Sequence, residues 1–202
     1  MKILAPSFYK QDGITVAKGL LGKILVREEL GGTYAFKIVE TEAYMGGEDK
    51  GAHVYGHKKT KRTAPLFEIG GTTYIYLIYG MYHCLNIAAN EIDVPHCVLI
   101  RAVEPIDEVA LGYAKANRKI KSKKEVDLTN GPGKLCRALK IDKSLNNALV
   151  TKKESLWIAE GEVPKEIVSA RRINIPYAEE YQDKLWRFYI KDNPYVSVII
   201  KE

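Results

Sequence analysis

Two stretches near the start of the chain alternate apolar and polar residues, which is the period of a β-strand with one buried face. They cover residues 24–30 and 33–41, and Gly31-Gly32 lies between them. A two-residue glycine loop between alternating stretches is typical of a β-hairpin. The pattern therefore predicts an antiparallel strand pair in this part of the chain.

A second strand pair follows and carries more aromatic side chains. Residues 72–79 and 82–88 are rich in β-branched and aromatic residues, and the tight turn Gly80-Met81 separates them. Hairpins of this kind make antiparallel neighbours. We expect further short strands at residues 98–103, 156–158, 168–173 and 196–200.

Three other segments repeat apolar residues at helical spacing. The first helix is expected at residues 12–21, where Asp12 can cap the start and Gly22 can end it. The second is expected to begin at Pro105 and run to about residue 117, because proline is tolerated in the first turn of a helix. The third opens at residues 130–134.

The order of these elements predicts the fold class. Strands in hairpins and helices in separate blocks favour an α+β fold with a largely antiparallel sheet over a doubly wound one. No repeat, low-complexity tract or linker interrupts the 202 residues. We therefore expect a single compact domain over residues 1–202, with helices around the sheet.

The composition of the chain indicates where in the cell the protein is expected. No apolar stretch approaches the ~20 residues that a membrane span needs, and residues 1–6 are too soon interrupted by proline for a signal peptide. We therefore expect a soluble, intracellular protein without membrane association, located in the cytoplasm or nucleoid if prokaryotic. An odd number of widely spaced cysteines favours reduced core thiols over disulfides. They are Cys84, Cys97 and Cys136.

The charge balance suits a polyanionic partner without requiring one. The 31 Lys and Arg residues exceed the 25 Asp and Glu residues, which gives a net charge of +6. Basic residues gather at 57–62 and 118–124, between apolar segments where surface loops are expected. Both runs are either solvated loops or part of a nucleic-acid surface.

Two glutamates in the second predicted strand are the first candidates for chemistry. Glu40 and Glu42 share one face of the strand, and carboxylates that close repel each other. One could act as a base while a partner neutralises the other. The plainer alternative is an exposed acidic strand end, which the pattern alone favours. The flanking Val39, Ala43 and Tyr44 favour a pocket instead.

Large side chains at the predicted hairpin turn are a second candidate. Tyr79, Met81 and Tyr82 surround Gly80. These side chains either fold back onto the sheet as core or stay exposed for a flat partner. In the second case a tyrosine could wedge into a stack of bases, as side chains of minor-groove proteins do.

Residues 130–134 place glycines and Lys134 at a helix start, where free N–H groups favour an anion. The full spacing of a nucleotide-binding phosphate loop is missing, so a contact with a DNA phosphate is the better candidate. His53 and His57 lie four residues apart, but no carboxylate or cysteine set with ligand spacing accompanies them. We expect neither a metal nor a cofactor.

With these segments located, the chain resembles the alkyladenine (3-methyladenine) DNA glycosylase family, whose members release alkylated and deaminated purines from duplex DNA. The resemblance covers nearly the whole chain, from residues 4–6 and 20–22 to residues 187–189 and 194–197. Four motifs in the same order carry most of it. They are IVETEAY at 38–44, YLIYGMY at 76–82, LIRAVEP at 99–105 and GPGKLC at 131–136.

The resemblance implies a catalytic group. Glu42 would be the general base that activates water, and Arg101 and the backbone carbonyl of Ile173 would help to hold that water. One departure concerns residues 172–175, Arg-Ile-Asn-Ile, where some relatives show glycine after the aliphatic residue. The resemblance therefore does not predict the backbone conformation at Asn174.

The same resemblance implies a base pocket and a DNA-inserting hairpin. Asn86 would crowd the exocyclic amino group of normal guanine. Tyr79 would fill the gap left in the duplex, with Met81 and Tyr82 beside it, on a hairpin that protrudes from a curved sheet. Three side chains would sandwich the extruded purine: Tyr44, His53 and Tyr76.

The resemblance also implies how the protein works and with what. Its partner would be double-stranded DNA containing damaged purines, bound by a monomer, without a lyase step because no lysine is expected in the matched pocket. Two alternatives stay open. One is a non-catalytic module that recognises bent or damaged duplex, and the other is a metal-dependent nuclease that uses acidic residues at 40, 42, 48 and 49.

Overall fold

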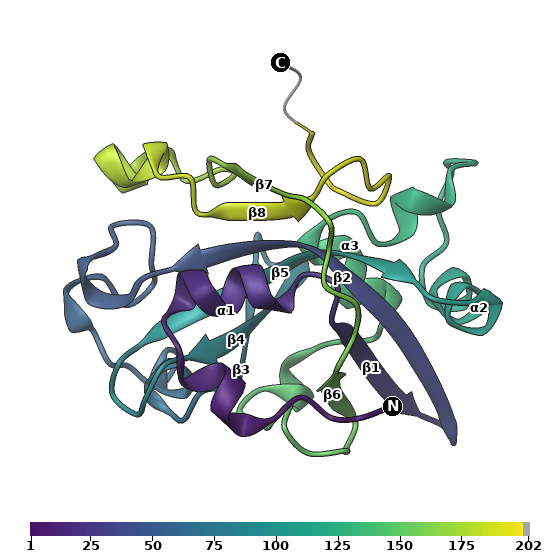
Figure 1. The fold of residues 1–202 in the computed structure, drawn as a ribbon, viewed down its shortest axis with the longest axis horizontal. Helices are drawn as coiled ribbons and strands as arrows, with labels where there is room; N and C mark the ends of the chain where they lie inside the picture. Colours follow the sequence, from purple (N-terminus) through teal and green to yellow (C-terminus); the bar gives the residue numbers. More distant parts are fainter. Residues whose placement is uncertain (200–202) are drawn as a thin grey trace.

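The computed structural model describes residues 1–199, and within them eight strands form one antiparallel sheet (Figure 1). The path through the sheet is β3-β4-β5-β2-β1-β6, while β8 pairs with β2 and β7 pairs with β8. The α+β fold with a largely antiparallel sheet is confirmed. The strands are β1 Ile24–Glu29, β2 Gly32–Tyr44, β3 Thr73–Ile78, β4 Tyr82–Ala89, β5 His96–Pro105, β6 Leu156–Ala159, β7 Ile167–Ala170 and β8 Arg187–Ile190.

The long strand β2 organises the sheet because it changes partner along its length. Its first half pairs with β1, residues 40–42 pair with β8, and β5 follows its other edge. The register with β5 shifts on both sides of Glu40. Such an irregularity bends a strand and re-aims its side chains. The bend falls at the two candidate glutamates.

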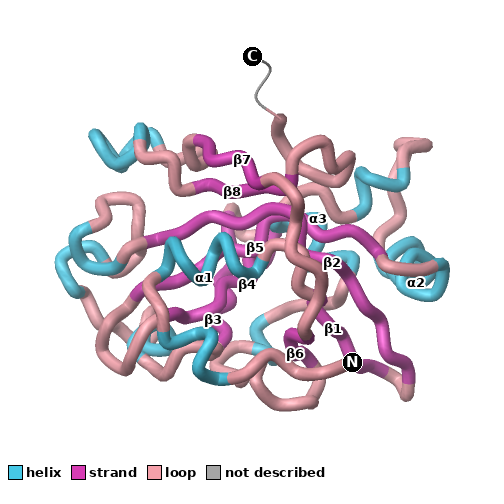
Figure 2. Tube along the Cα trace, viewed as in Figure 1, coloured by secondary structure: helices cyan, strands magenta, loops and turns pink. Residues whose placement is uncertain are grey.

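The sheet curls until its two ends approach each other. The segment 148–150 lies between the outer strands: the N–H of Thr73 in β3 donates to the carbonyl of Ala148 (2.8 Å), and the N–H of Ile158 in β6 donates to that of Val150 (3.0 Å). The result resembles a partly closed barrel. Figure 2 shows the strands crossing the molecule, with short helices around them.

Three α-helices in the described residues surround this sheet: α1 Gly13–Leu20, α2 Glu108–Asn117 and α3 Pro132–Ala138. The first is capped as expected, because Asp12 accepts from the N–H groups of Ile14 and Thr15. Shorter 3₁₀ turns join the elements. They are Pro6–Lys10, Gly46–Glu48, Tyr55–His57, Ala64–Phe67, Glu125–Leu128, Lys143–Leu145 and Pro176–Asp183.

The predicted start of α2 is wrong. Pro105 is the last residue of β5, opposite Phe36, and the helix begins three residues later. The side chain of Asp107 accepts from the N–H of Ala110 and fixes that start. An aspartate cap satisfies a free N–H group of the first turn, which proline cannot do.

Both hairpin turns differ from expectation by one residue. The first turn is Leu30-Gly31 instead of Gly31-Gly32, and both of its residues have positive φ (51° and 76°). The second loop contains three residues, 79–81, with Tyr79 at φ 53°. Positive φ matches the twist that hairpin strands require.

Two strand predictions near the end of the chain need correction. Residues 196–199 form no strand, and Ile200 lies outside the described residues. The predicted strand at 168–173 is shorter, because β7 ends at Ala170. The pattern also missed β8, whose first three residues, Arg187, Phe188 and Tyr189, are buried. A strand buried on both faces shows no alternation.

The main apolar core lies between the curled sheet and its helices. Leu20 of α1 packs in the same cluster as Phe36, Ile38 and Ile100 of the sheet. The three cysteines are buried and free, which confirms their assignment to the core. Among residues 1–199, none of the helices has the length and apolar character to cross a membrane.

Gly22 tests the packing of this fold. Its φ is +81°, and an added Cβ would lie 2.0 Å from the carbonyl oxygen of Glu162, so Gly22→Ala combines backbone strain with a clash. We expect it to lower the free energy of unfolding by about 3 kcal/mol or more. Gly31→Ala is the matched control, because Gly31 has φ +76° with nothing within 4 Å. It should lose only about 1 kcal/mol. Urea unfolding measures both, and equal losses would contradict the clash.

Candidate active site

One cavity of about 600 Å³ collects most of the candidate residues. Its wall is built from β2, β3, the hairpin loop, β5, the start of α3 and the segment 173–177. These elements are far apart in sequence and meet only through the curl of the sheet. The sequence candidates in this wall are Glu42, Tyr44, His53, Tyr76, Tyr79, Tyr82, Arg101, Lys134 and Ile173.

Glu42 is fully buried from bulk solvent, yet it lines this cavity. Its Oε1 lies 3.1 Å from Nη1 of Arg101 and accepts from the N–H of Ile173 at 2.8 Å. Its Oε2 accepts from the Tyr44 hydroxyl at 2.9 Å. A carboxylate offers about four lone-pair positions, and these contacts use three. One position on Oε2 is left for a water in the cavity.

The hydroxyl of Tyr44 is suited to this contact. Burial, and secondarily the charge of Glu42, raises the pKa of Tyr44 well above its ordinary value. The phenol therefore stays protonated and donates a hydrogen bond to Glu42. Its ring faces the pocket, so one residue orients the carboxylate and forms part of the aromatic wall.

The second glutamate has a different environment. Glu40 is fully buried and does not line the cavity. Its Oε1 accepts from Nε of Arg101 (3.1 Å) and Nη1 of Arg187 (2.9 Å), and its Oε2 accepts from the N–H of Ser197 (2.7 Å). The exposed acidic strand end that the pattern favours is therefore wrong for Glu40 and for Glu42.

Two carboxylates and two guanidinium groups thus alternate in one buried ion cluster, in the order Glu42, Arg101, Glu40, Arg187. Burial opposes the charge of Arg101, but Glu42 and Glu40 outweigh it and raise the pKa of Arg101. Buried charges are tolerated only when paired and hydrogen-bonded. Arg101 shares its charge between the two carboxylates and fixes their separation.

The backbone around Ile173 resolves the departure from the family pattern. The contact that Ile173 makes with Glu42 runs through its N–H group. The following residue, Asn174, has φ +58°. Asparagine tolerates this left-handed conformation better than most residues other than glycine. Asn174 therefore adopts, without glycine, a left-handed conformation that glycine adopts most readily.

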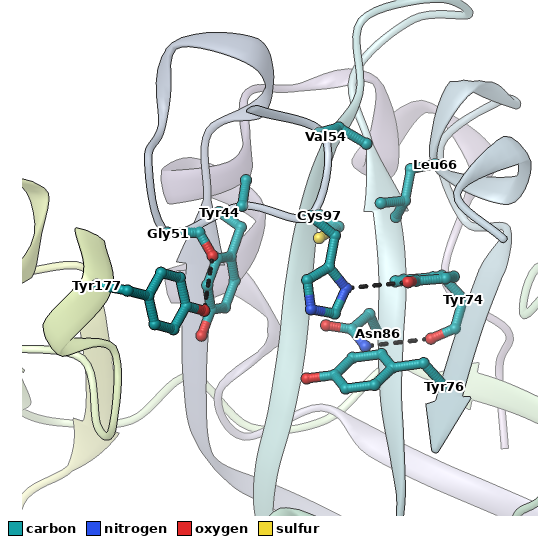
Figure 3. A pocket seen from close by; sticks show the side chains of 11 residues that line it. Tyr44, Gly51, Val54, Leu66, Tyr74, Tyr76, Asn86, Cys97 and Tyr177 are labelled. Carbon is teal, nitrogen blue, oxygen red and sulfur yellow. Dashed lines mark hydrogen bonds between the residues drawn. The ribbon is translucent and has the colours of Figure 1, made fainter. Parts of the chain in front are cut away.

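A smaller cavity of about 30 Å³ adjoins the large one and shares four lining residues with it. Figure 3 shows Tyr76 and Asn86 on one side of it and Tyr44 and Tyr177 on the other. The ring of His53 stands nearly edge-on to Tyr76, with centroids 4.6 Å apart. This volume has room for no more than a few waters, so the aromatic side chains must move apart before a flat ring can enter.

His53 has a fixed partner and no charge at neutral pH. Its Nδ1 lies 3.0 Å from the hydroxyl of Tyr74. Desolvation, with the nearby charge of Arg62, lowers the pKa of His53 to about 4. Since one ring nitrogen contacts Tyr74, the other is available to the pocket.

Asn86 lines the smaller cavity and is 3% exposed. Its Nδ2 donates to the carbonyls of Tyr74 (3.2 Å) and Cys84 (3.5 Å). These bonds to β3 and β4 hold the amide in one place. A buried side chain held in this way is a rigid obstacle to any ring in the pocket.

The hairpin tip is exposed. Tyr79 is 76% exposed, Met81 69% and Tyr82 41%, so the fold-back alternative is wrong. Tyr79 and Tyr82 line the large cavity, whereas Met81 does not. An added Cβ on Gly133 would lie 2.9 Å from the Cβ of Tyr82, so this glycine allows α3 to approach the hairpin closely.

Lys134 lines the outer part of the cavity, so the expectation of a pocket without lysine is wrong. Its Nζ donates to Oδ1 of Asn130 at 2.6 Å and lies 4.0 Å from Asp127. The side chain is 39% exposed. It can therefore meet an anion at the rim of the cavity.

No sequence pattern predicted a role in the pocket for Arg172. Its guanidinium forms two short bonds to Asp49 (2.6 and 2.8 Å), and neither side chain is exposed. It also stacks over the ring of Tyr44, 4.7 Å from the centroid. The pair fastens the loop after β2 to the segment after β7. Because 123 residues separate the partners, no local pattern could show the pair.

Tyr177 was also missed. It lines both cavities, and its hydroxyl donates to the carbonyl of Gly51 at 3.4 Å (Figure 3). It is 61% exposed. The only sequence signal was an aromatic residue beside the Arg-Ile-Asn-Ile segment.

The arrangement defines a class of site. A cavity-facing carboxylate with one free lone-pair position can take a proton from water. Neutral aromatic walls suit a flat heterocycle, and cations at the rim suit its phosphate. A hydrolytic site for a planar, anionic substrate fits these features.

Comparison with known proteins identifies the family. The family model described as methylpurine-DNA glycosylase matches residues 7–194. A relative from Natranaerobius thermophilus is 48% identical over 95% of this chain and 96% of its own length. One from Clostridioides difficile is 50% identical over 91% and 98%. The name of each contains the words "3-methyladenine DNA glycosylase". The chain belongs to the methylpurine-DNA glycosylase family.

The ion pair behind Tyr44 gives a stability test. Asp49→Asn leaves Arg172 with a buried, unneutralised charge, so we expect the free energy of unfolding to fall by about 3–5 kcal/mol. Asp93→Asn is the control, because Asp93 forms an exposed pair with Lys59. It should lose less than about 1 kcal/mol. Denaturant unfolding of the two variants decides, and a small loss for Asp49→Asn would show that the pair is not needed for stability.

Proposed function

We propose that this chain hydrolyses the N-glycosidic bond of alkylated or deaminated purines in duplex DNA and leaves an abasic site. One observation carries the proposal. Of the two buried glutamates, only Glu42 lines the cavity, and it keeps one lone-pair position there while Arg101 and Ile173 hold it. Membership of the methylpurine-DNA glycosylase family supports a DNA substrate.

A base inside a duplex is out of reach of Glu42, so the nucleotide must swing out of the helix, at a cost of a few kcal/mol. Stacking on aromatic side chains returns about 1–3 kcal/mol per base. The slot between Tyr44, His53 and Tyr76 can supply this for the extruded purine once it opens. The exposed ring of Tyr79 can supply it for the gap in the duplex.

The chemical step balances with water alone. Glu42 takes a proton from a water on its Oε2 side, the water oxygen bonds to the sugar C1′, and the C–N bond breaks with its electron pair leaving on the purine. A purine made cationic by alkylation leaves as a neutral base. A neutral lesion such as hypoxanthine also needs a proton on the departing ring.

We propose that the reaction stops at the abasic site. Lys134 is the lysine in the cavity wall, and its Nζ is already bonded to Asn130. A protonated amine held in this way suits a phosphate contact better than attack on the sugar. We also propose that the chain acts as a monomer.

The alternatives fit less well. A metal-dependent nuclease needs carboxylates free for a cation, but Glu40, Glu42 and Asp49 each pair with a buried arginine. Among residues 1–199 no group of three His, Cys, Asp or Glu side chains could hold a metal ion. A non-catalytic binding module gives no reason for a carboxylate held by Arg101 in a cavity.

Replacement of Glu42 tests the base. Glu42→Gln keeps the size of the side chain and removes its basicity. We expect single-turnover release of hypoxanthine from a duplex to fall by at least ~10²-fold, with lesion-DNA binding nearly unchanged. The exposed Glu48 lies outside the cavity wall, so Glu48→Gln should keep full activity. Full activity in Glu42→Gln would place the base elsewhere, with Glu40 the next candidate.

Replacement of Asn86 tests substrate selection. Asn86→Ser removes an amide fixed in the pocket floor and makes room for an exocyclic amino group. We expect release of normal guanine to rise relative to release of adenine-type lesions. Competing substrates in one reaction measure the ratio. An unchanged ratio would rule out a steric role for this residue.

A further inference from the structure

A second basic groove lies beside the hairpin, outside the active-site cavity. Its volume is about 430 Å³. It contains an apolar floor and three cationic side chains, which come from the loop before β3 and from the 3₁₀ turn Lys143–Leu145. The lining residues are Lys61, Arg62, Ile75, Tyr76, Leu77, Lys143 and Asn146.

The groove lies on the far face of β3. Along this edge strand Tyr76 and Ile78 line the active-site cavity, whereas the alternate residues Ile75 and Leu77 line the groove. Successive side chains of a strand point to opposite faces. The hairpin β3–β4 therefore has the lesion cavity on one side and the basic groove on the other, with Tyr76 at the boundary.

The charges of this groove are uncompensated. No acidic residue lines it, and Lys61, Arg62 and Lys143 have no carboxylate within ion-pair distance in residues 1–199. Elsewhere on the surface, lysines such as Lys50 and Lys115 are paired. The nearest acid in sequence, Asp142, is bonded to Ser144 in its own turn. Three unpaired cations favour an anionic partner.

The apolar residues of the groove indicate which kind of anionic ligand it can bind. Leu77 is 41% exposed, and Ile75, which is 3% exposed, also lines the groove. Apolar surface rimmed by cations suits an alternation of sugar and phosphate better than a small inorganic ion. A polynucleotide backbone offers both parts.

We propose that this groove binds the sugar-phosphate backbone of the undamaged strand. The inference rests on the proposed function, in which the hairpin tip enters the duplex. A wedge in the minor groove has one backbone on each side of it. The extruded nucleotide reaches the cavity, so the lesion strand follows that face of β3. The complementary strand then follows the other face, along Ile75 and Leu77.

The lesion strand has cations of its own. Arg118 lines the active-site cavity and also a third groove, of about 510 Å³, which shares no lining residue with the groove beside β3. That groove continues along the basic run, with Lys119, Lys123 and Lys124 in its wall. Lys61 and Arg62 of the first basic run and most of the second run therefore line separate grooves. The geometry assigns one run to each strand of the duplex.

The test asks whether the loss of one lysine and the loss of the phosphate charges of one strand have additive effects on binding. Lys143→Ala removes an exposed charge outside the catalytic residues. Binding is measured to hypoxanthine duplexes in which neutral methylphosphonates replace the phosphates flanking the lesion site, in either strand. We expect Lys143→Ala alone to weaken binding by about tenfold, and the neutral undamaged strand alone to weaken it by at least as much, because it loses the contacts of all three cations. Combined, they should weaken it no further, because they remove the same contact.

The control is Lys165→Ala, which removes the same charge from an exposed position outside all the cavities described. Its effect should be small and should simply add to that of either neutral strand. Additive effects for Lys143→Ala with the undamaged strand, or coupling to the lesion strand, would overturn the assignment. Lys61→Ala is a second variant with the same expectation.

This design separates the inference from the proposed function. Base release by the unaltered protein from the unmodified duplex tests the proposed function alone. If base is released and no coupling appears, only the groove assignment fails. If lesion duplex is bound with coupling to the undamaged strand but no base is released, the groove stands and the hydrolytic proposal fails.

Discussion

The site depends on one buried cluster of alternating charges, which consists of Glu42, Arg101, Glu40 and Arg187. Two negative and two positive groups cancel there, and each has further hydrogen bonds from the chain. Removing one member would leave a buried charge without a partner. The bend in β2 aims both carboxylates at this cluster, and only the end nearest the cavity is exposed to a ligand.

The walls of the pocket depend on a second buried pair. Arg172 and Asp49 join two segments that belong to opposite ends of the chain, and Arg172 supports the back of Tyr44. Tyr44 in turn donates to Glu42. The Glu42 carboxylate, the aromatic wall and the backbone at Ile173 therefore form one connected unit. A shift in any of these parts changes the position of the carboxylate.

The hairpin β3–β4 divides the molecular surface into two working faces. Successive side chains of β3 point alternately into the active-site cavity and into the basic groove. The exposed rings of Tyr79 and Tyr82 at its tip line the large cavity. The segment around residue 147 already bonds to the start of β3, and cations border the rest of this edge, where they oppose pairing with another chain and suit a nucleic acid.

The sequence by itself determined most of the local elements, because alternation, turn glycines and caps act over a few residues. It predicted the α+β sheet and the two hairpins, and the family resemblance chose Glu42 over Glu40 as the candidate base. It did not decide whether Glu40 and Glu42 were buried, nor show β8 or the partner of Arg172. Those depend on residues over a hundred positions apart, which only the curled sheet brings together. Tertiary packing decides which charges lose water, and solvation decides what a carboxylate can do.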